Sequence, residues 1–213
     1  MSGIFGVITG GKYNSEKLAT KMAKAMCHRE WYVSEIYEDR NLALSLGRIG
    51  IGIFNPKSQP VWNDDHTVGL FMAGEFINPD FSNTGVNFMG SNENRALLFY
   101  EKYGKEFPRY FKGSFIVTIL DLNLNRVIIA NDRFGLYPTY YTTQKIPFLF
   151  APEIKGILCD TSFEKRLDLT ALAQYMRFQH LLGTRTFFEN IELLPNASVL
   201  EYDLVKGEYT INS

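Results

Sequence analysis

The residue with the clearest chemical potential is Ser2, which would become the N-terminus of the chain after removal of Met1. Its hydroxyl is a nucleophile, and a free α-amine on the same residue can act as the base that takes up the hydroxyl proton. The apolar residues 3–7 that follow predict a strand. This pattern is typical of amide hydrolysis by an N-terminal residue, and the alternative interpretation of Ser2 is a small residue tolerated at a strand start.

The elements that must position Ser2 are mostly strands. We expect strands at residues 3–7, 33–37, 42–46, 49–54, 68–77, 115–121, 126–131, 138–143, 199–203 and 208–211, and helices at 15–28, 93–103 and 168–178. Ser15 and Asp168 are the expected N-caps, and Gly104 is expected to end the second helix in a left-handed conformation. Because strands and helices do not alternate regularly, the sequence predicts an α+β sandwich of antiparallel sheets covered by helices.

The composition indicates a globular protein and excludes several partner classes. The chain has 213 residues, of which 46 % are hydrophobic and 21 % charged, and no repeat or linker is evident, so we expect one domain over residues 1–213. A net charge of -1 offers no basic surface for nucleic acid or an anionic membrane. Apolar runs such as residues 115–120 are too short to span a bilayer, and no signal segment precedes Ser2, so a cytoplasmic protein is expected.

The cysteines and histidines do not predict a cofactor or a metal site. Cys27 and Cys159 are isolated in the sequence and lack the spacing of a zinc site or a disulfide framework. The three histidines, His28, His66 and His180, are scattered along the chain. We therefore expect two reduced cysteines and no bound cofactor or metal.

Several short blocks follow one another in an order that carries a resemblance to a known family. They occupy residues 1–6, 26–29, 46–51, 73–78, 90–93, 111–115, 130–141, 151–155 and 186–195. The first reads Met-Ser-Gly-Ile-Phe-Gly, against Met-Cys-Gly-Ile-Phe-Gly in the family, and residues 130–141 resemble Gly-Arg-Asp-x-x-Gly-x-x-Pro-Leu-Tyr-Tyr. The family is that of class II glutamine amidotransferase domains, in particular those of asparagine synthetases. The ordered set is specific, whereas any one tripeptide within it would be weak evidence.

The resemblance implies a fold, an activity and a partner. The fold would be the four-layer αββα sandwich of the N-terminal nucleophile hydrolases, and the activity would be hydrolysis of glutamine to supply ammonia. In asparagine synthetases an ATP-dependent synthetase domain follows this domain and uses the ammonia. The Ser-Gly-Gly-x-Asp-Ser loop of that second domain is absent from residues 1–213, so an ATP-dependent synthetase would have to act as a partner, in cis or in trans.

The resemblance also assigns roles to particular residues. Ser2 stands at the position of the nucleophile and Gly74 at that of the backbone N–H that helps to hold the oxyanion. Arg48 matches the arginine that binds the glutamine carboxylate, and Glu75 and Asn92 fall at further substrate-binding positions. Arg48 is open to a second interpretation, as a structural ion-pair partner.

Four departures from the family pattern put the activity in doubt. Ser2 replaces the cysteine, Ala73 replaces the asparagine that supplies a second oxyanion donor, and Asn92 replaces the aspartate that receives the substrate ammonium. The Gly-Pro-Asp of the loop over the glutamine pocket reads Glu-Trp-Tyr at residues 30–32, whose rings could fill the pocket. The first hypothesis is a degenerate glutaminase site in a structural or regulatory module.

Two alternatives remain open from the sequence. In one, the domain is an active hydrolase that uses Ser2 on glutamine or on another amide, which requires removal of Met1. In the other, it is a module that binds an amino acid through Arg48.

Overall fold

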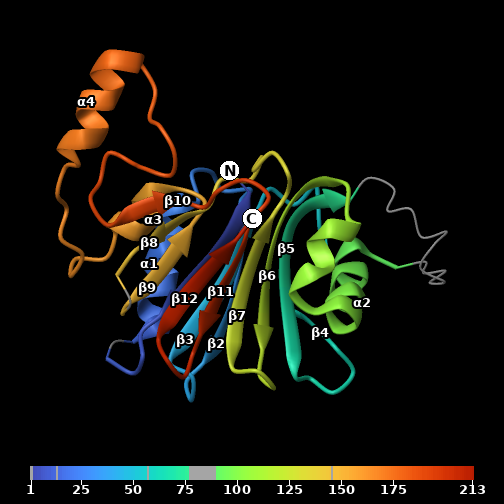
Figure 1. Cartoon of the computed structure of the whole chain (residues 1–213). Coiled ribbons are helices and arrows are strands. Elements are labelled where there is room, and N and C mark those ends of the chain that lie inside the picture. Colours follow the sequence, from blue (N-terminus) through green and yellow to red (C-terminus); the bar gives the residue numbers. More distant parts are fainter. Residues whose placement is uncertain (1, 13, 57, 77–89, 145) are drawn as a thin grey trace.

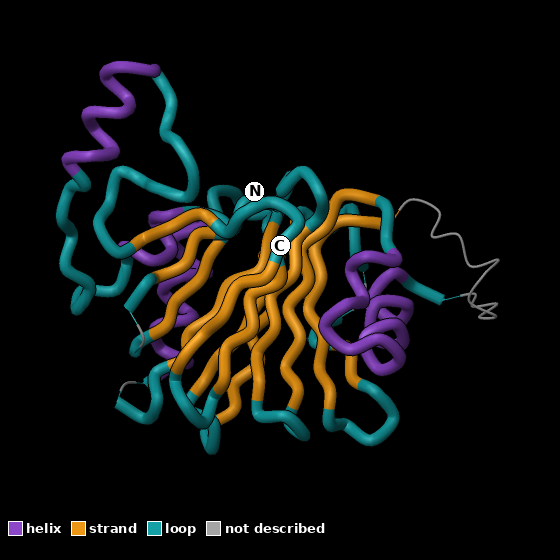
Figure 2. Tube along the Cα trace, in the orientation of Figure 1, coloured by secondary structure: helices purple, strands orange, loops and turns teal. Residues whose placement is uncertain are grey.

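Two antiparallel sheets packed face to face form the body of the molecule (Figures 1 and 2). The structure is a computed structural model, and it describes residues 2–12, 14–56, 58–76, 90–144 and 146–213. The first sheet contains β1 (Gly3–Ile8), β2 (Val33–Asp39), β3 (Leu44–Gly50), β8 (Tyr140–Thr142), β9 (Phe148–Ala151) and β10 (Ile191–Leu193). The second contains β4 (Val61–Trp62), β5 (Val68–Phe76), β6 (Gly113–Asp121), β7 (Arg126–Asn131), β11 (Val199–Asp203) and β12 (Glu208–Asn212). Among the described residues, the strand orders are β10-β8-β9-β1-β3-β2 and β12-β11-β7-β6-β5-β4.

Helices cover both outer faces of this pair of sheets. They are α1 (Ser15–Met26), α2 (Asn92–Tyr103), the 3₁₀ helix η2 (Gly104–Tyr110) and α3 (Ile154–Leu158). A further helix, α4 (Leu169–Phe178), covers neither face. The helices α1 and α3 pack on the first sheet, and α2 and η2 pack on the second. The order of layers is helix, sheet, sheet, helix, which confirms the expected four-layer α+β sandwich. No helix in the described ranges is long and apolar enough to cross a membrane.

Strand β1 shows why the start of the sequence is apolar at consecutive positions. Neighbouring side chains of a strand point to opposite faces, so Ile4 and Ile8 pack between the two sheets while Phe5 and Val7 pack against α1. All four side chains are buried. The strand that follows Ser2 is therefore fixed on both faces, between β3 and β9.

The helix starts agree with the sequence in one case and differ in another. Asp168 caps α4 as expected, since its Oδ1 accepts the N–H of Ala171 at 3.0 Å. The expectation that Ser15 caps α1 is wrong, because Asn14 Oδ1 accepts the N–H of Lys17 at 2.7 Å. Gly104 follows α2 with a positive φ of 55°, but its ψ of -142° differs from the expected left-handed helical conformation, because the chain continues directly into η2.

The strand boundaries differ most around residues 42–54, where two strands were expected. One strand, β3, occupies the middle of this range. Ala43 before it and Gly52 after it have positive φ values of 51° and 75°, so the backbone turns at both ends and residues 51–55 leave the sheet. The short elements β4, β9, β10 and α3 were not expected, and residue 77, the expected end of β5, lies outside the described residues.

A buried carboxylate fixes the loop after β7. The Asp132 side chain accepts the N–H of Phe134 at 2.8 Å and those of Phe115 and Leu136 at 3.2 Å. It is 1 % exposed. These bonds satisfy three backbone donors and hold residues 133–136 in one conformation at the upper end of the sandwich in Figure 1.

Helix α4 extends away from the sandwich (Figure 1). Ala171 is its one buried residue among those described. We call this projecting helix, residues 169–178, the α4 arm. Its base is held by an ion pair between Asp168 Oδ2 and Arg185 Nη1 at 2.8 Å. The N–H of Ala171 and the guanidinium of Arg185 hold the pKa of Asp168 below its usual range. The ionised carboxylate therefore stabilises the folded arm.

We predict that acid loosens α4 through Asp168. Because the pKa is lower in the folded chain, the stabilisation is complete at neutral pH and is lost as pH falls from about 5 through the native pKa. Amide hydrogen exchange in α4, corrected for the intrinsic effect of pH, should become faster over that range. Asp168→Asn should show the faster exchange already at pH 7, and Glu189→Gln, which changes an exposed carboxylate in the same region, should not. An unchanged pH dependence in Asp168→Asn would contradict this account.

Candidate active site

The residues expected to carry the chemistry gather at one end of the sandwich. Ser2 precedes β1, Arg48 lies near the end of β3, Gly74 and Glu75 near the end of β5, and Asn92 begins α2. The antiparallel register pairs Gly3 with Ile49, and β5 packs on both β1 and β3. The start of β1 and the ends of β3 and β5 therefore meet at the upper end of the molecule in Figure 1.

Ser2 is half-buried beside the segment that follows β9. A Cβ added at Gly3 would lie 2.5 Å from Pro152 Cβ, so the chain start packs tightly against this segment. The next residue, Glu153, accepts from His28 Nε2 at 2.9 Å and pairs with Lys155 Nζ at 3.2 Å. The contact of His28 with Glu153 ties the loop after α1 to the start of α3.

The loop at residues 27–32 borders a cavity of about 550 Å³ lined by Cys27, His28, Arg29, Glu30 and Trp31. Trp31 does not fill it, because its side chain is 65 % exposed. Tyr32 is half-buried and packs edge-on to His28 at 5.9 Å between ring centroids. None of the residues expected to bind glutamine lines this cavity, so the expectation that the two rings fill the glutamine pocket stays a prediction.

Cys27 does not offer a thiolate in place of the missing family cysteine. Burial raises the pKa of its thiol above the ordinary value, which outweighs the opposing hydrogen bond with Ser34. The protonated thiol is a poor nucleophile at neutral pH.

Within the described residues, no group of three or more His, Cys, Asp and Glu side chains could hold a metal ion.

Arg48 is buried and engaged by the protein itself. Its Nη2 lies 2.6 Å from Glu35 Oε2, and its Nη1 donates to the backbone oxygen of Asn55 at 2.6 Å. The side chain is 8 % exposed. Since a guanidinium binds a carboxylate best through two parallel N–H groups, a substrate carboxylate would have to compete with both partners.

The side chain of Asn55 connects the remaining site elements. Its Oδ1 accepts the N–H of Gly74 at 3.0 Å, and its Nδ2 donates to Glu93 Oε1 at 2.7 Å. The orientation of the amide follows from its neighbours, because a backbone N–H can only donate and a carboxylate accepts. All of this lies in the interior, where Glu93 is 1 % exposed.

Gly74 is required at its position by backbone geometry. Its φ is 102°, and a Cβ there would lie 2.1 Å from the backbone oxygen of Ser114. The residue before it, Ala73, is buried between the sheets and presents a methyl group with no donor. The backbone N–H of Gly74 is thus the group at this position that could donate to an oxyanion. Asn55 Oδ1 already accepts its hydrogen bond.

The two other expected substrate-binding residues lie at the surface of this cluster. Glu75 is exposed, and its charge, together with that of Asp132, adds to burial in raising the pKa of Tyr137. Asn92 is half-buried at the start of α2, one residue after the N-cap Ser91. The structure therefore brings Arg48 and Gly74 together through Asn55, while Glu75 and Asn92 stay at the edge.

Three residues of the cluster escaped the sequence analysis: Glu35, Asn55 and Gln59. Gln59 acts like a strand partner for β5, because its Oε1 accepts the N–H of Met72 at 2.7 Å and its Nε2 donates to the backbone oxygen of Met72 at 3.1 Å. The dipeptide Asn55-Pro56 indicates a turn in the sequence. The sequence pattern does not show that the side-chain amide of Asn55 points into the interior.

We predict that the Glu35 carboxylate is needed to keep Arg48 buried. Glu35→Gln removes one partner of a buried guanidinium, so the free energy of unfolding should fall by about 3 kcal/mol. Glu38→Gln is the matched control on the same strand, since its partner Arg40 is exposed and such pairs contribute less than about 1 kcal/mol. Urea unfolding of both variants measures the difference, and equal losses would show that burial adds nothing to the Glu35 pair.

Comparison of the sequence with known proteins shows the family of this chain. A family model described as the glutamine amidotransferase domain matches residues 1–210. Asparagine synthetase 2 (glutamine-hydrolyzing) of Bacillus subtilis is 27 % identical over 222 residues, which cover 98 % of this chain and 30 % of that protein. Asparagine synthetase B (glutamine-hydrolyzing) of Escherichia coli is 29 % identical over 166 residues, covering 74 % of this chain and 30 % of that protein. The chain thus spans about a third of the length of these curated relatives.

The fold has its own relatives among solved structures. Glutamine phosphoribosylpyrophosphate amidotransferase from B. subtilis, solved with ADP and GMP, superposes with a TM-score of 0.64 at 12 % identity, over all of this chain and 49 % of that one. At this identity the likeness concerns the fold alone. Because the family model spans nearly every residue and the two-sheet architecture agrees, the chain belongs to the glutamine amidotransferase domains of class II, of the asparagine synthetase type.

Proposed function

We propose that the glutaminase site of this domain is inactive and that the domain is a structural or regulatory module of an asparagine-synthetase-like system. The observation that carries the proposal is the hydrogen bond from the Gly74 N–H to Asn55 Oδ1, at 3.0 Å. Glutamine hydrolysis needs donors that are available to the oxyanion, and the loss of one such donor costs about 2.7–4 kcal/mol of transition-state stabilisation. Here the backbone donor has an internal acceptor, and Ala73 supplies no second one.

The groups that would bind glutamine support the same conclusion. A glutamine carboxylate would have to displace Glu35 from Arg48, and the substrate ammonium would meet the neutral amide of Asn92 in place of a carboxylate. Both changes weaken the charge-assisted bonds that usually position an amino acid. An associated synthetase would then use free ammonia or another amine.

We predict that Ser2→Cys alone does not create glutaminase activity. The thiol would improve the nucleophile, but it would leave the engaged Gly74 N–H, Ala73 and Asn92 as they are. Ammonia release from glutamine, coupled to a glutamate dehydrogenase assay, should stay at the blank rate for the parent protein and for Ser2→Cys. A clear gain in Ser2→Cys would contradict the proposal.

The same assay separates this proposal from hydrolysis by Ser2. Ammonia release by the parent protein that disappears in Ser2→Ala would establish an active hydrolase instead. Intact mass spectrometry adds an independent check, since a chain that retains Met1 has no free amine on Ser2 to act as the base.

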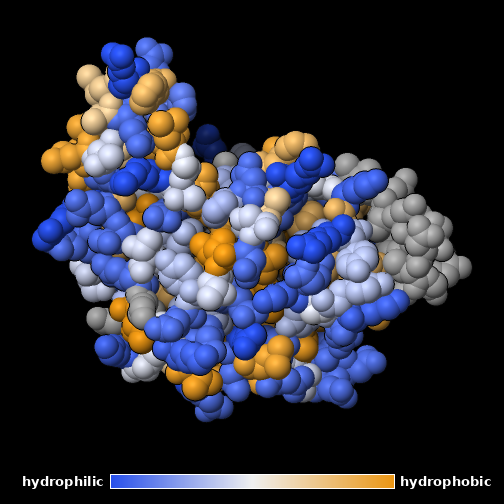
Figure 3. Space-filling view, in the orientation of Figure 1, coloured by the Kyte–Doolittle hydropathy of each residue, from blue (hydrophilic) through white to orange (hydrophobic). Residues whose placement is uncertain are grey.

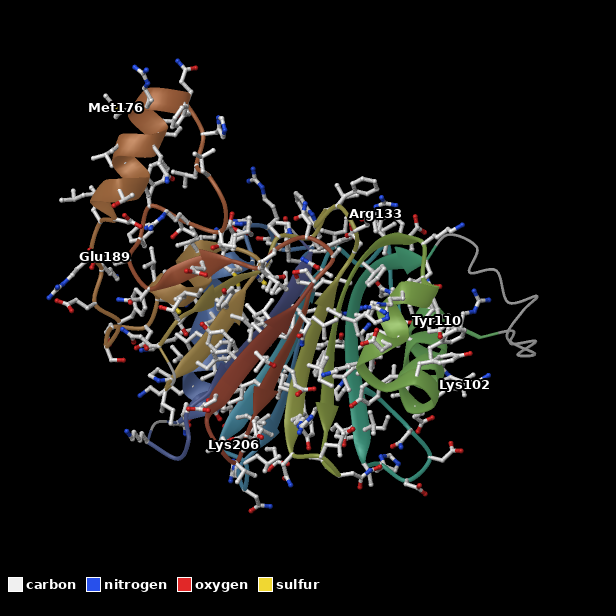
Figure 4. The ribbon with its side chains drawn as sticks, in the orientation of Figure 1. Lys102, Tyr110, Arg133, Met176, Glu189 and Lys206 are labelled. Atoms are coloured by element: carbon white, nitrogen blue, oxygen red, sulfur yellow. The ribbon has the colours of Figure 1, made fainter. Side chains whose placement is uncertain are left out.

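We further propose that the synthetase partner contacts the α4 arm. The curated relatives are about three times as long as this chain, so their domain of this type works beside a second module. Leu169 and Met176 are 70 % and 77 % exposed, and Figure 3 shows orange, apolar side chains on the arm at the upper left. In Figure 4, Met176 points away from the sandwich. A cluster of exposed apolar residues on one element is typical of a contact surface.

We predict that Leu169→Asp with Met176→Asp weakens the association of the domain with its synthetase by about tenfold or more, because charges enter an apolar contact. The domain itself should unfold at the same temperature, since both side chains are exposed. Val205→Asp, at an 80 % exposed apolar position in the β11–β12 turn, is the matched control. Equal association of all three proteins, measured by sedimentation with the synthetase supplied in trans or by limited proteolysis of the linked protein, would exclude the arm as the contact.

A further inference from the structure

A second cavity lies outside the candidate active site, on the outer face of the second sheet. Its volume is about 590 Å³, and it opens between η2 on one side and the ends of β7 and β12 and the start of β11 on the other. Figure 1 shows α2 beside this sheet and β11 and β12 within it, and Figure 4 labels Arg133 at the upper end of the sandwich. None of the residues expected to bind glutamine lines it.

The floor of this cavity is apolar. It is formed by Phe111 and Phe115, which are buried, and by Val199 at the start of β11. Both polar atoms of the Asn131 side chain have a partner within the protein, because its Nδ2 donates to the backbone oxygen of Pro195 and its Oδ1 accepts the N–H of Ser198, both at 2.8 Å. The floor can therefore accept a hydrophobic body but offers few hydrogen bonds.

The rim of the cavity carries an excess of positive charge. Lys105, Arg109, Lys112 and Arg133 line it, and Glu106 is its one acidic side chain among the described residues. Glu106 pairs with Arg109 at 2.9 Å. Over the described ranges, no Asp or Glu carboxylate lies within 4.0 Å of the charged nitrogens of Lys105, Lys112 or Arg133.

One wall of the cavity is held in position before any ligand arrives. The carboxylate of Asp132 fixes the loop that carries Arg133 and Phe134, through its bonds to the N–H groups of Phe134 and Leu136. Phe134 is 67 % exposed even though its backbone is held. A backbone that is already held beneath an aromatic ring and a cation lowers the ordering cost of binding.

We propose that this cavity binds a small molecule with a flat apolar body and one anionic group, a carboxylate or a phosphate ester. The volume falls in the range of about 300–1,000 Å³ that is usual for small-molecule sites. The apolar floor suits the body of such a ligand, and the cations of Lys112 and Arg133 suit its charge. The site is separate from glutamine chemistry and does not depend on the proposed function.

The test uses 2-naphthoate as the anionic probe and 2-naphthylmethylammonium as its cationic counterpart with the same ring system. Protein-detected NMR titration should give saturable binding of naphthoate with a dissociation constant of about 1 mM or lower, and at least about tenfold weaker binding of the cation. The shifted amides should surround Gly113, Val199 and Asn212. A second titration with 2-naphthyl phosphate shows which of the two anionic groups binds more tightly.

Charge reversal supplies the decisive comparison. Lys112→Glu with Arg133→Glu should weaken naphthoate binding by at least about tenfold, while Lys21→Glu with Lys24→Glu, on exposed positions of α1, changes the net charge equally and should stay within about twofold. All four substituted side chains are exposed, so folding is retained and can be checked by the NMR spectrum. Absence of saturation, equal binding of the cation, equal weakening by both double variants, or shifts centred on α4 would each overturn the proposal.

Discussion

The arrangement of the candidate site depends on one buried amide. Asn55 Oδ1 accepts from Gly74 and Nδ2 donates to Glu93, while the backbone oxygen of the same residue accepts from Arg48. Three parts of the chain that are distant in sequence, the end of β3, the end of β5 and the start of α2, are joined through this residue. Because unpaired buried polar groups cost about 1–3 kcal/mol each, the network is favourable only if every member is present.

The two sheets explain why such a network can exist at the end of the sandwich. Strand β4 pairs with β5 only at Val61 and Trp62, so the edge of β5 near Met72 and Gly74 has no neighbouring strand there. The side chains of Gln59 and Asn55 supply the hydrogen bonds that a strand would have supplied. Side-chain amides can do this because they carry a donor and an acceptor in the same geometry as a peptide group. The sheet edge is thereby protected without another strand.

Much of the fold was predictable from the sequence, and the reasons are physical. Long elements with clear periodicity, such as β6, β7 and α2, follow from local pattern, and Asp168 was readable as a cap because its chemistry is local. The short strands β9 and β10 and the helix α3 were missed, since their stability comes from neighbours that the pattern does not reveal. The positions of Arg48 and Gly74 could be expected from the family blocks. Their partners Glu35 and Asn55 could not, because spacing reveals neither the register that places Glu35 on β2 opposite Arg48 on β3 nor the inward turn of the Asn55 amide.

The way these polar groups are satisfied bears on how a hydrolase site could lose its chemistry while keeping its fold. An active site keeps donors and cations available for a transition state, and this availability usually lowers stability. Here Arg48 and the Gly74 N–H, the two groups best suited to hold a substrate carboxylate and an oxyanion, contribute to the folded state through Glu35 and Asn55. Each internal bond therefore has to be broken before the same group can bind a substrate. Regaining catalysis would require both to be broken, which makes the proposed loss of function stable against single substitutions.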